Sequence, residues 1–142
     1  MKEQNFKNHT RYVPGYHGIT LLAIMALLIG SFFNLFKSSK DNLYSASLIC
    51  LIAGILCLVF WYMRSFALRA QDRAIRAEEN FRHFILTGKP FPAGLRMGQI
   101  IALRFASDAE LPALTNRAVT ENLKSSAIKE AIQHWRADHY RA

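Results

Sequence analysis

Two long stretches of the sequence lack any formally charged residue. They run from Val13 to Phe36, with His17 counted as neutral, and from Leu43 to Met63. A helix that crosses a bilayer needs about 20 mainly apolar residues, and both stretches meet that length. The segment after Ile29 is bulky and aromatic, so it offers no cleavage site for a signal peptide. The sequence therefore predicts two transmembrane helices.

The same stretches lack the ionisable side chains on which membrane chemistry depends. Neither contains Asp, Glu, Lys or Arg, and His17 lies near an end. Transporters and pumps place ionisable groups at membrane depth, and haem between helices needs His or Met ligands, for which Met25 is the one mid-span candidate. We therefore do not expect a pump, a permease or a cytochrome acting alone. A subunit of a larger complex stays open.

Catalytic signatures are absent as well. The sequence contains no Gly-rich phosphate loop, no HExxH and no CxxC. His134 and His139 are five residues apart and point to different faces of a helix, so they make a poor metal pair. Glu78, Glu79 and Asp108 lie near arginines and are interpreted as ion-pair partners, with Glu78 placed four residues before Arg82. We predict no enzyme, no catalytic, cofactor-binding or metal-ligating residue, and no cofactor.

What the sequence does contain is basic charge, with a formal net charge of +8. Lys2, Lys7 and Arg11 precede the first stretch, Arg64, Arg69, Arg73 and Arg76 follow the second, and the turn between them holds Lys37, Lys40 and Asp41. This distribution of Lys and Arg predicts that both termini are cytoplasmic. The basic residues would face anionic lipid headgroups, and no nucleic acid is expected as a partner.

Small residues recur at helical spacing within the two stretches. Ala26 and Gly30 lie in the first, and Ala46, Cys50 and Gly54 lie in the second. Helices in lipid associate largely through close backbone approach at small residues. We expect these faces to meet, either within the hairpin or between copies of the chain.

The second stretch continues into a charged helix without an intervening Gly, Pro or turn cluster. Its apolar residues then recur at spacings of three and four, which is a heptad seam made of Ala67, Ala70, Ala74, Ala77, Phe81 and Phe84. The favoured interpretation is that this seam packs on the chain's own C-terminal helices, and the alternative is a dimer. Arg69, Arg73 and Arg76 line the adjacent face, either as a solvated, lipid-facing stripe or as an anion site. One helix over 43–86 would be roughly 65 Å long.

The remaining sequence predicts short helices. Gly88, Pro90 and Pro92 end the long helix. Helical patterns follow over 95–106, over 107–123 with a possible start nearer Glu110, and over 125–141. The predicted fold is all-α: a transmembrane helical hairpin with an extended second helix and a small cytoplasmic helical domain. Its segments are 1–17 (cytoplasmic or interfacial), 18–36 (first transmembrane helix), 37–42 (external turn), 43–63 (second transmembrane helix), 64–86 (cytoplasmic extension), 87–94 (Pro/Gly loop) and 95–142 (cytoplasmic helical bundle).

Four segments carry a resemblance to a known family. They read QNFKNHTRYVPGYH, ALRAQDRAIRAEENFRHFILTGKP, QIIALRFASDAELPAL and AIKEAIQHWRADHYR. The chain resembles a family of small two-span bacterial membrane proteins classed under a domain of unknown function. The resemblance implies a bacterial inner-membrane protein with a cytoplasmic helical domain, and it assigns no site residue. The resulting hypothesis is a non-enzymatic accessory or scaffold protein, with a protein partner or a homo-oligomer. The alternatives are a subunit of a transport or secretion complex and a membrane-tethered sensor of an anionic ligand.

Overall fold

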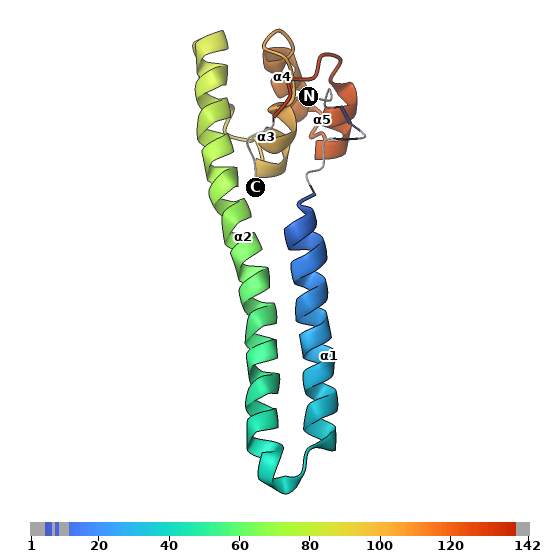
Figure 1. The fold of residues 1–142 in the computed structure, drawn as a ribbon. Coiled ribbons are helices and arrows are strands. Elements are labelled where there is room, and N and C mark those ends of the chain that lie inside the picture. Colours follow the sequence, from blue (N-terminus) through green and yellow to red (C-terminus); the bar gives the residue numbers. More distant parts are fainter. Residues whose placement is uncertain (1–4, 7, 9–11, 139–142) are drawn as a thin grey trace. The chain divides into compact units, whose positions relative to one another are not determined.

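A computed structural model of the chain describes Asn5, Phe6, Asn8 and residues 12–138. In chain order, a π-helical turn at Gly15–Thr20 leads into α1 (Leu21–Lys37), a 3-10 turn at Lys40–Asn42 precedes α2 (Leu43–Thr87), and α3 (Met97–Leu103), α4 (Leu111–Thr120) and α5 (Ser125–Ala131) follow (Figure 1). These residues form no β-strand, which confirms the all-helical class. Lys2, Lys7, Arg11 and His139, which the sequence interpretation used, lie outside the described residues.

The chain divides into two compact units at Ala67. The first unit, Arg11–Ala67, holds α1 and the N-terminal part of α2. The second holds the rest of α2 from Leu68 with α3, α4 and α5, and it also includes Asn5, Phe6 and Asn8. The helix itself is uninterrupted over its 45 residues. The predicted continuation of the second apolar stretch into a charged helix is therefore confirmed.

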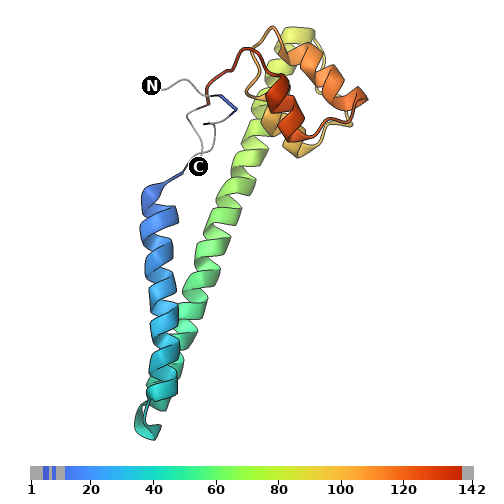
Figure 2. The same ribbon diagram turned by 90° about the vertical axis from the view of Figure 1, so that its right-hand side faces the viewer.

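In the first unit, α1 and α2 run antiparallel and lie side by side in both ribbon views (Figures 1 and 2). Ser31 of α1 and Ala46 and Ala53 of α2 are the side chains buried there. At the other end the Tyr16 ring stacks on Phe60 with 4.3 Å between the ring centroids, and the Tyr16 hydroxyl donates to the Phe60 carbonyl at 2.6 Å. Small residues in the middle allow the close approach that the aromatic pair then fixes in register.

The contact between α1 and α2 differs from the predicted one. Ala26 and Gly30 are exposed, and a Cβ atom built at Gly30 or Gly54 would meet nothing within 4 Å. For Ala26 and Gly30 the first predicted alternative, packing within the hairpin, is therefore wrong, and packing between copies stays a prediction. On α2, Ala46 is buried and Cys50 and Gly54 are half-buried, so the predicted residues of the second helix lie on its less exposed side.

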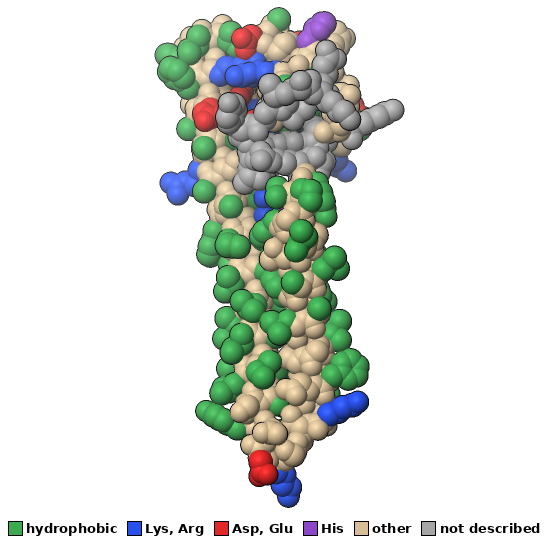
Figure 3. Space-filling model, in the orientation of Figure 1, with side chains coloured by type: hydrophobic (Ala, Val, Ile, Leu, Met, Phe, Trp, Pro, Cys, Tyr) green, Lys and Arg blue, Asp and Glu red, His purple; other side chains and the backbone are tan. Residues whose placement is uncertain are grey.

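The outer surface of this unit is apolar. Hydrophobic side chains cover α1 and the adjoining part of α2, while Lys and Asp side chains gather at the turn (Figure 3). Ile19, Leu22 and Trp61 are each more than 70 % exposed, with values of 74 %, 71 % and 71 %. Two helices, Gly15–Lys37 and Lys40–Thr87, are long and apolar enough to cross a membrane by length and composition.

The end of α2 follows the predicted chemistry. Gly88 has a φ of +71°, the left-handed conformation that glycine adopts without strain, and its N–H donates to the Phe84 carbonyl at 2.8 Å. His83 is buried beside this turn. Its Nδ1 lies 2.9 Å from the Lys89 carbonyl oxygen and its ring packs on Phe91. The imidazole therefore fastens the chain that leaves the helix back onto the helix.

The second unit has its own hydrophobic core. α2 contributes Ile75, and the rest comes from α3, α4, α5 and their connections: Leu95, Ile100, Ala102, Leu103, Phe105, Ala106, Leu111, Leu114, Ala118, Ile128 and Ile132. α4 begins at Leu111 with Pro112 in its first turn, so the later of the two predicted starts is correct. The helix predicted over 95–106 is shorter, at Met97–Leu103, and residues 95–106 supply half of this core.

The last helix is much shorter than predicted. α5 ends at Ala131, and Ile132 has extended backbone angles of −70° and 121°. The chain then runs beside the end of α3, where the Arg136 N–H donates to the Phe105 carbonyl at 2.8 Å and the Trp135 ring lies 5.0 Å from the Phe105 ring. The helix predicted over 125–141 would have continued through Ile132 and Trp135. The extended backbone, however, brings Trp135 onto Phe105 and satisfies backbone groups at the end of α3.

Gln99 ties the short helices together. It is only 3 % exposed. Its Oε1 accepts from the Arg96 N–H at 2.8 Å, and its Nε2 donates to the carbonyls of Ala118 and Leu123 at 2.9 and 3.0 Å. A buried amide is stabilising when its hydrogen bonds are made and costly when they are not. Here both ends of the amide have partners, so it fixes α3 against the end of α4.

Candidate functional site

The part of α2 beyond Ala67 presents a continuous apolar face to solvent. We call Ala67, Ala70, Ala74, Ala77, Phe81 and Phe84 the Ala–Phe face. In heptad letters, Ala67, Ala74 and Phe81 occupy position a, and Ala70, Ala77 and Phe84 occupy position d. All six are exposed, with Phe81 at 63 % and Phe84 at 49 %. The favoured expectation that this face packs on the chain's own C-terminal helices is therefore wrong.

The opposite face of the same helix carries the intrachain packing. Ile75 and Arg82 occupy position b, Glu79 position f and His83 position c, all on the side away from a and d. Ile75, Glu79 and His83 are 6–7 % exposed, and the Arg82 side chain is 12 % exposed. α2 is therefore two-sided: a largely polar face is buried against the helical domain, and an apolar face is left outside.

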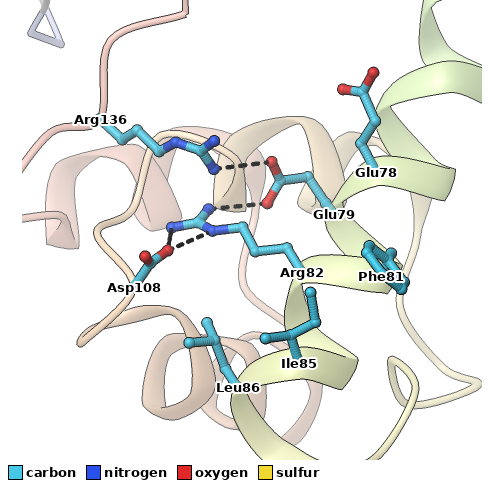
Figure 4. Close-up of a pocket in the computed structure, with 8 residues that line it drawn as sticks. All are labelled: Glu78, Glu79, Phe81, Arg82, Ile85, Leu86, Asp108 and Arg136. Carbon is cyan, nitrogen blue, oxygen red and sulfur yellow. Dashed lines mark hydrogen bonds and ion pairs between the residues drawn. The ribbon is translucent and has the colours of Figure 1, made fainter.

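An ion-pair network holds the buried face in place (Figure 4). Arg82 Nη1 lies 2.9 Å from Glu79 Oε2, and Arg82 Nε donates to Asp108 Oδ1 at 2.7 Å. Arg82 Nη2 also donates to the Ala106 carbonyl at 2.8 Å, and Arg136 Nη1 lies 3.6 Å from Glu79 Oε1. One guanidinium thus joins α2 to the loop after α3, and Glu79 joins α2 to the C-terminal segment.

A further ion pair joins the end of α3 to the C-terminal segment. Arg104 is 7 % exposed, and its Nη1 lies 3.1 Å from Asp138 Oδ2. Its guanidinium carbon is 4.7 Å from the centroid of the Phe105 ring, within the range of a cation–π contact. The extended segment after α5 is thus held by charge at Arg136 and Asp138 and by packing at Trp135.

The predicted ion-pair partners are confirmed in two of three cases. Glu79 and Asp108 both bind Arg82, and the three-residue spacing of Glu79 and Arg82 was readable in the sequence. Glu78 does not pair with Arg82, and Figure 4 shows its carboxylate directed away from the network. Asp108 and Arg136 are 26 and 54 positions from Arg82 in the sequence, so no local pattern could assign them to this site.

The three arginines of the predicted stripe do not share one environment in the structure. Arg69, Arg73 and Arg76 are all exposed. Arg73 and Arg76 line a hollow of about 440 Å³ with an apolar floor that includes Phe91, and Arg69 is not among its lining residues. Two of the three arginines therefore share one concave surface beside apolar side chains.

The described residues contain no group of three or more His, Cys, Asp or Glu side chains placed to hold a metal ion. Cys50 and Cys57 are free thiols, both half-buried in α2. On α4, the hydrogen bond from Arg117 to Glu121 raises the pKa of the Arg117 side chain.

Fold and site together define an all-helical protein with two helices long and apolar enough to cross a membrane. The whole chain, residues 1–142, matches the Family of unknown function (DUF6526), and it belongs to that family. No curated protein and no solved structure matches the chain.

The ion-pair network predicts a specific pattern of stability losses. Arg82→Met would leave the Glu79 carboxylate buried, with only Arg136 at 3.6 Å, and is expected to lower the free energy of unfolding by about 3 kcal/mol. The double variant Arg82→Met/Glu79→Met would recover much of this loss, because the buried charge is removed as well. Denaturant unfolding of the full chain in detergent, followed by tryptophan fluorescence, measures both.

Arg117→Met provides the matched control, because Arg117 pairs with Glu121 at 3.1 Å on the exposed surface of α4. Exposed pairs contribute little to stability, so this variant should unfold like the original protein. Equal losses for Arg82→Met and for the double variant would contradict the buried-charge explanation.

Proposed function

We propose that this protein is anchored in the bacterial inner membrane by α1 and the N-terminal part of α2, with both termini in the cytoplasm. It acts there without catalysis, as an accessory or scaffold protein that makes helix–helix contacts beside the membrane. The uncharged stretches, the basic residues that flank them and the apolar outer surface of the first unit support the anchoring.

The proposed helix–helix contact is supported mainly by the two different faces of α2. Polar and charged side chains on one face hold the helical domain, and the Ala–Phe face stays exposed. An apolar face at heptad spacing is the pattern by which helices recognise other helices, and exposed apolar patches mark interaction sites. The proposed role therefore needs no residue beyond this face and the membrane anchor.

The proposed topology predicts where introduced cysteines can be labelled. In a chain with Cys50→Ala and Cys57→Ala, a cysteine at Ser39 in the turn should react with a membrane-impermeant maleimide in spheroplasts. A cysteine at Ser126, at the start of α5, should react only after the membrane is permeabilised. If the cysteine at Ser126 and not the one at Ser39 is labelled before permeabilisation, the orientation is the reverse of the proposed one. Labelling of both cysteines at that stage would refute the two-span arrangement.

Association should be sensitive to the Ala–Phe face and not to the outer face of the hairpin. Ala74→Glu places a charge in the centre of the proposed contact and is expected to abolish the assembly seen by native mass spectrometry after gentle extraction. Gly30→Leu is a useful comparison, because no atom lies within 4 Å of the position its Cβ would take. Loss of assembly with Gly30→Leu alone would favour the alternative, a subunit of a transport or secretion complex.

A second candidate function is the sensing of an anionic ligand at the hollow that Arg73 and Arg76 share. Binding of inorganic phosphate by the solubilised protein would then weaken as NaCl screens the arginines. Arg76→Gln should weaken that binding further, while Arg69→Gln, outside the hollow, should not. Absent or salt-insensitive binding in a titration by calorimetry would end this candidate.

A further inference from the structure

We infer that the Ala–Phe face binds the same face of a second copy of this chain, with the two α2 helices parallel and in register. The inference rests on the proposed function, because two copies anchored in one membrane with the same topology present their α2 helices in the same direction. A symmetric pair of this kind uses one surface twice and closes without further subunits.

Position a of the heptad frame of α2 already serves helix packing in the first unit. Counted back from Ala67, position a falls on Phe60, Ala53 and Ala46. Ala46 and Ala53 are buried, and Phe60 stacks on Tyr16. The same frame continues beyond Ala67 on exposed residues. Position a of α2 therefore packs against α1 in the first unit and continues beyond it on exposed residues. Position d is exposed in both parts of the helix, at Ile49, Leu56 and Met63 in the first unit.

Charge complementarity identifies the partner. Residue Arg73 precedes Ala74 and occupies position g, and Glu78 follows Ala77 and occupies position e. In a parallel pair, position g of one helix meets position e of the other five residues later, and these pairs set partner and orientation. Arg73 and Glu78 are five residues apart and both exposed. A parallel pair thus forms the Arg73–Glu78 contact twice, whereas an antiparallel pair forms it nowhere.

The remaining e and g positions do not oppose this pairing. Position g holds Phe66 and Asn80, and position e holds Gln71 and Ile85, so no like charges face each other.

The apolar contact is uneven along the helix. The alanines allow close approach but bury little area, while Phe81, Phe84 and Ile85, exposed by 63 %, 49 % and 66 %, supply most of the area. Confinement to one membrane raises the effective concentration, so a modest contact suffices.

A cysteine scan tests the register. In the full chain with Cys50→Ala and Cys57→Ala, single cysteines at Ala70, Ala74 and Ala77 should form disulfide-linked homodimers when native membranes are oxidised with copper phenanthroline. Cysteines at Arg69 and Arg76 occupy position c and should not. Ala70→Cys is the sharpest case, because identical residues meet at position d only when the helices are parallel and in register.

A charge exchange tests the partner assignment. Arg73→Glu and Glu78→Arg each place like charges together at both symmetric contacts and should reduce Ala70→Cys crosslinking by about tenfold. The double variant Arg73→Glu/Glu78→Arg should restore it. Arg76→Glu makes the same change of charge at position c, outside the e and g contacts, and it should leave crosslinking unchanged.

The outcomes separate this inference from the proposed function. A crosslinked product containing a different protein at Ala70 or Ala77 would overturn self-association and leave the scaffold role intact. Equal homodimer yields at Ala70, Arg69 and Arg76 would indicate random collision and overturn the register, as would failure of the double charge exchange to restore crosslinking. No crosslinked product of either kind at any position of the Ala–Phe face would overturn both proposals.

Discussion

The contact between Glu79 and Arg82 decides which face of α2 the helical domain covers. A buried carboxylate is tolerated only beside a cation that compensates its lost hydration, and here Arg82 lies 2.9 Å away. The same guanidinium reaches Asp108 and the Ala106 carbonyl, so the loop after α3 must lie on the Glu79 side of the helix. Once that side is occupied, the Ala–Phe face has no place in the intrachain core.

The regular elements were predictable because they depend on local rules. The continuation of α2 beyond the apolar stretch follows from good helix formers, with no Gly or Pro from Val59 to Thr87. Its end follows from Gly88, whose φ of +71° glycine adopts without strain. The turn before α2 was similarly predictable from its polar residues. Each of these features needs information from only a few neighbouring residues, which the sequence supplies directly.

The packing face of α2 was not predictable by the same means. Apolar periodicity selects Ala70, Ala74 and Phe81, whereas the structure buries Ile75, Glu79 and His83. Two of those three are polar, and their burial is stable only because of partners elsewhere: Arg82 and Arg136 for Glu79, and the Lys89 carbonyl for His83. The extended segment after α5 was unpredictable for the same reason, because it depends on a distant partner. The Arg136 N–H donates to the carbonyl of Phe105, which is far away in the sequence. The arginine stripe was expected from the sequence, but the hollow that Arg73 and Arg76 line without Arg69 was not.

Anchoring and association are linked through the composition of the Ala–Phe face. Four of its six residues are alanines, and each alanine removes little apolar area from water when a second helix approaches. Two free copies in solution would pay the full loss of translational and rotational freedom against that small gain. Copies held in one membrane have already lost part of this freedom and share one orientation, so the same face becomes sufficient. In the proposed arrangement the hairpin is therefore part of the recognition mechanism, because it makes a weak but specific helical face effective.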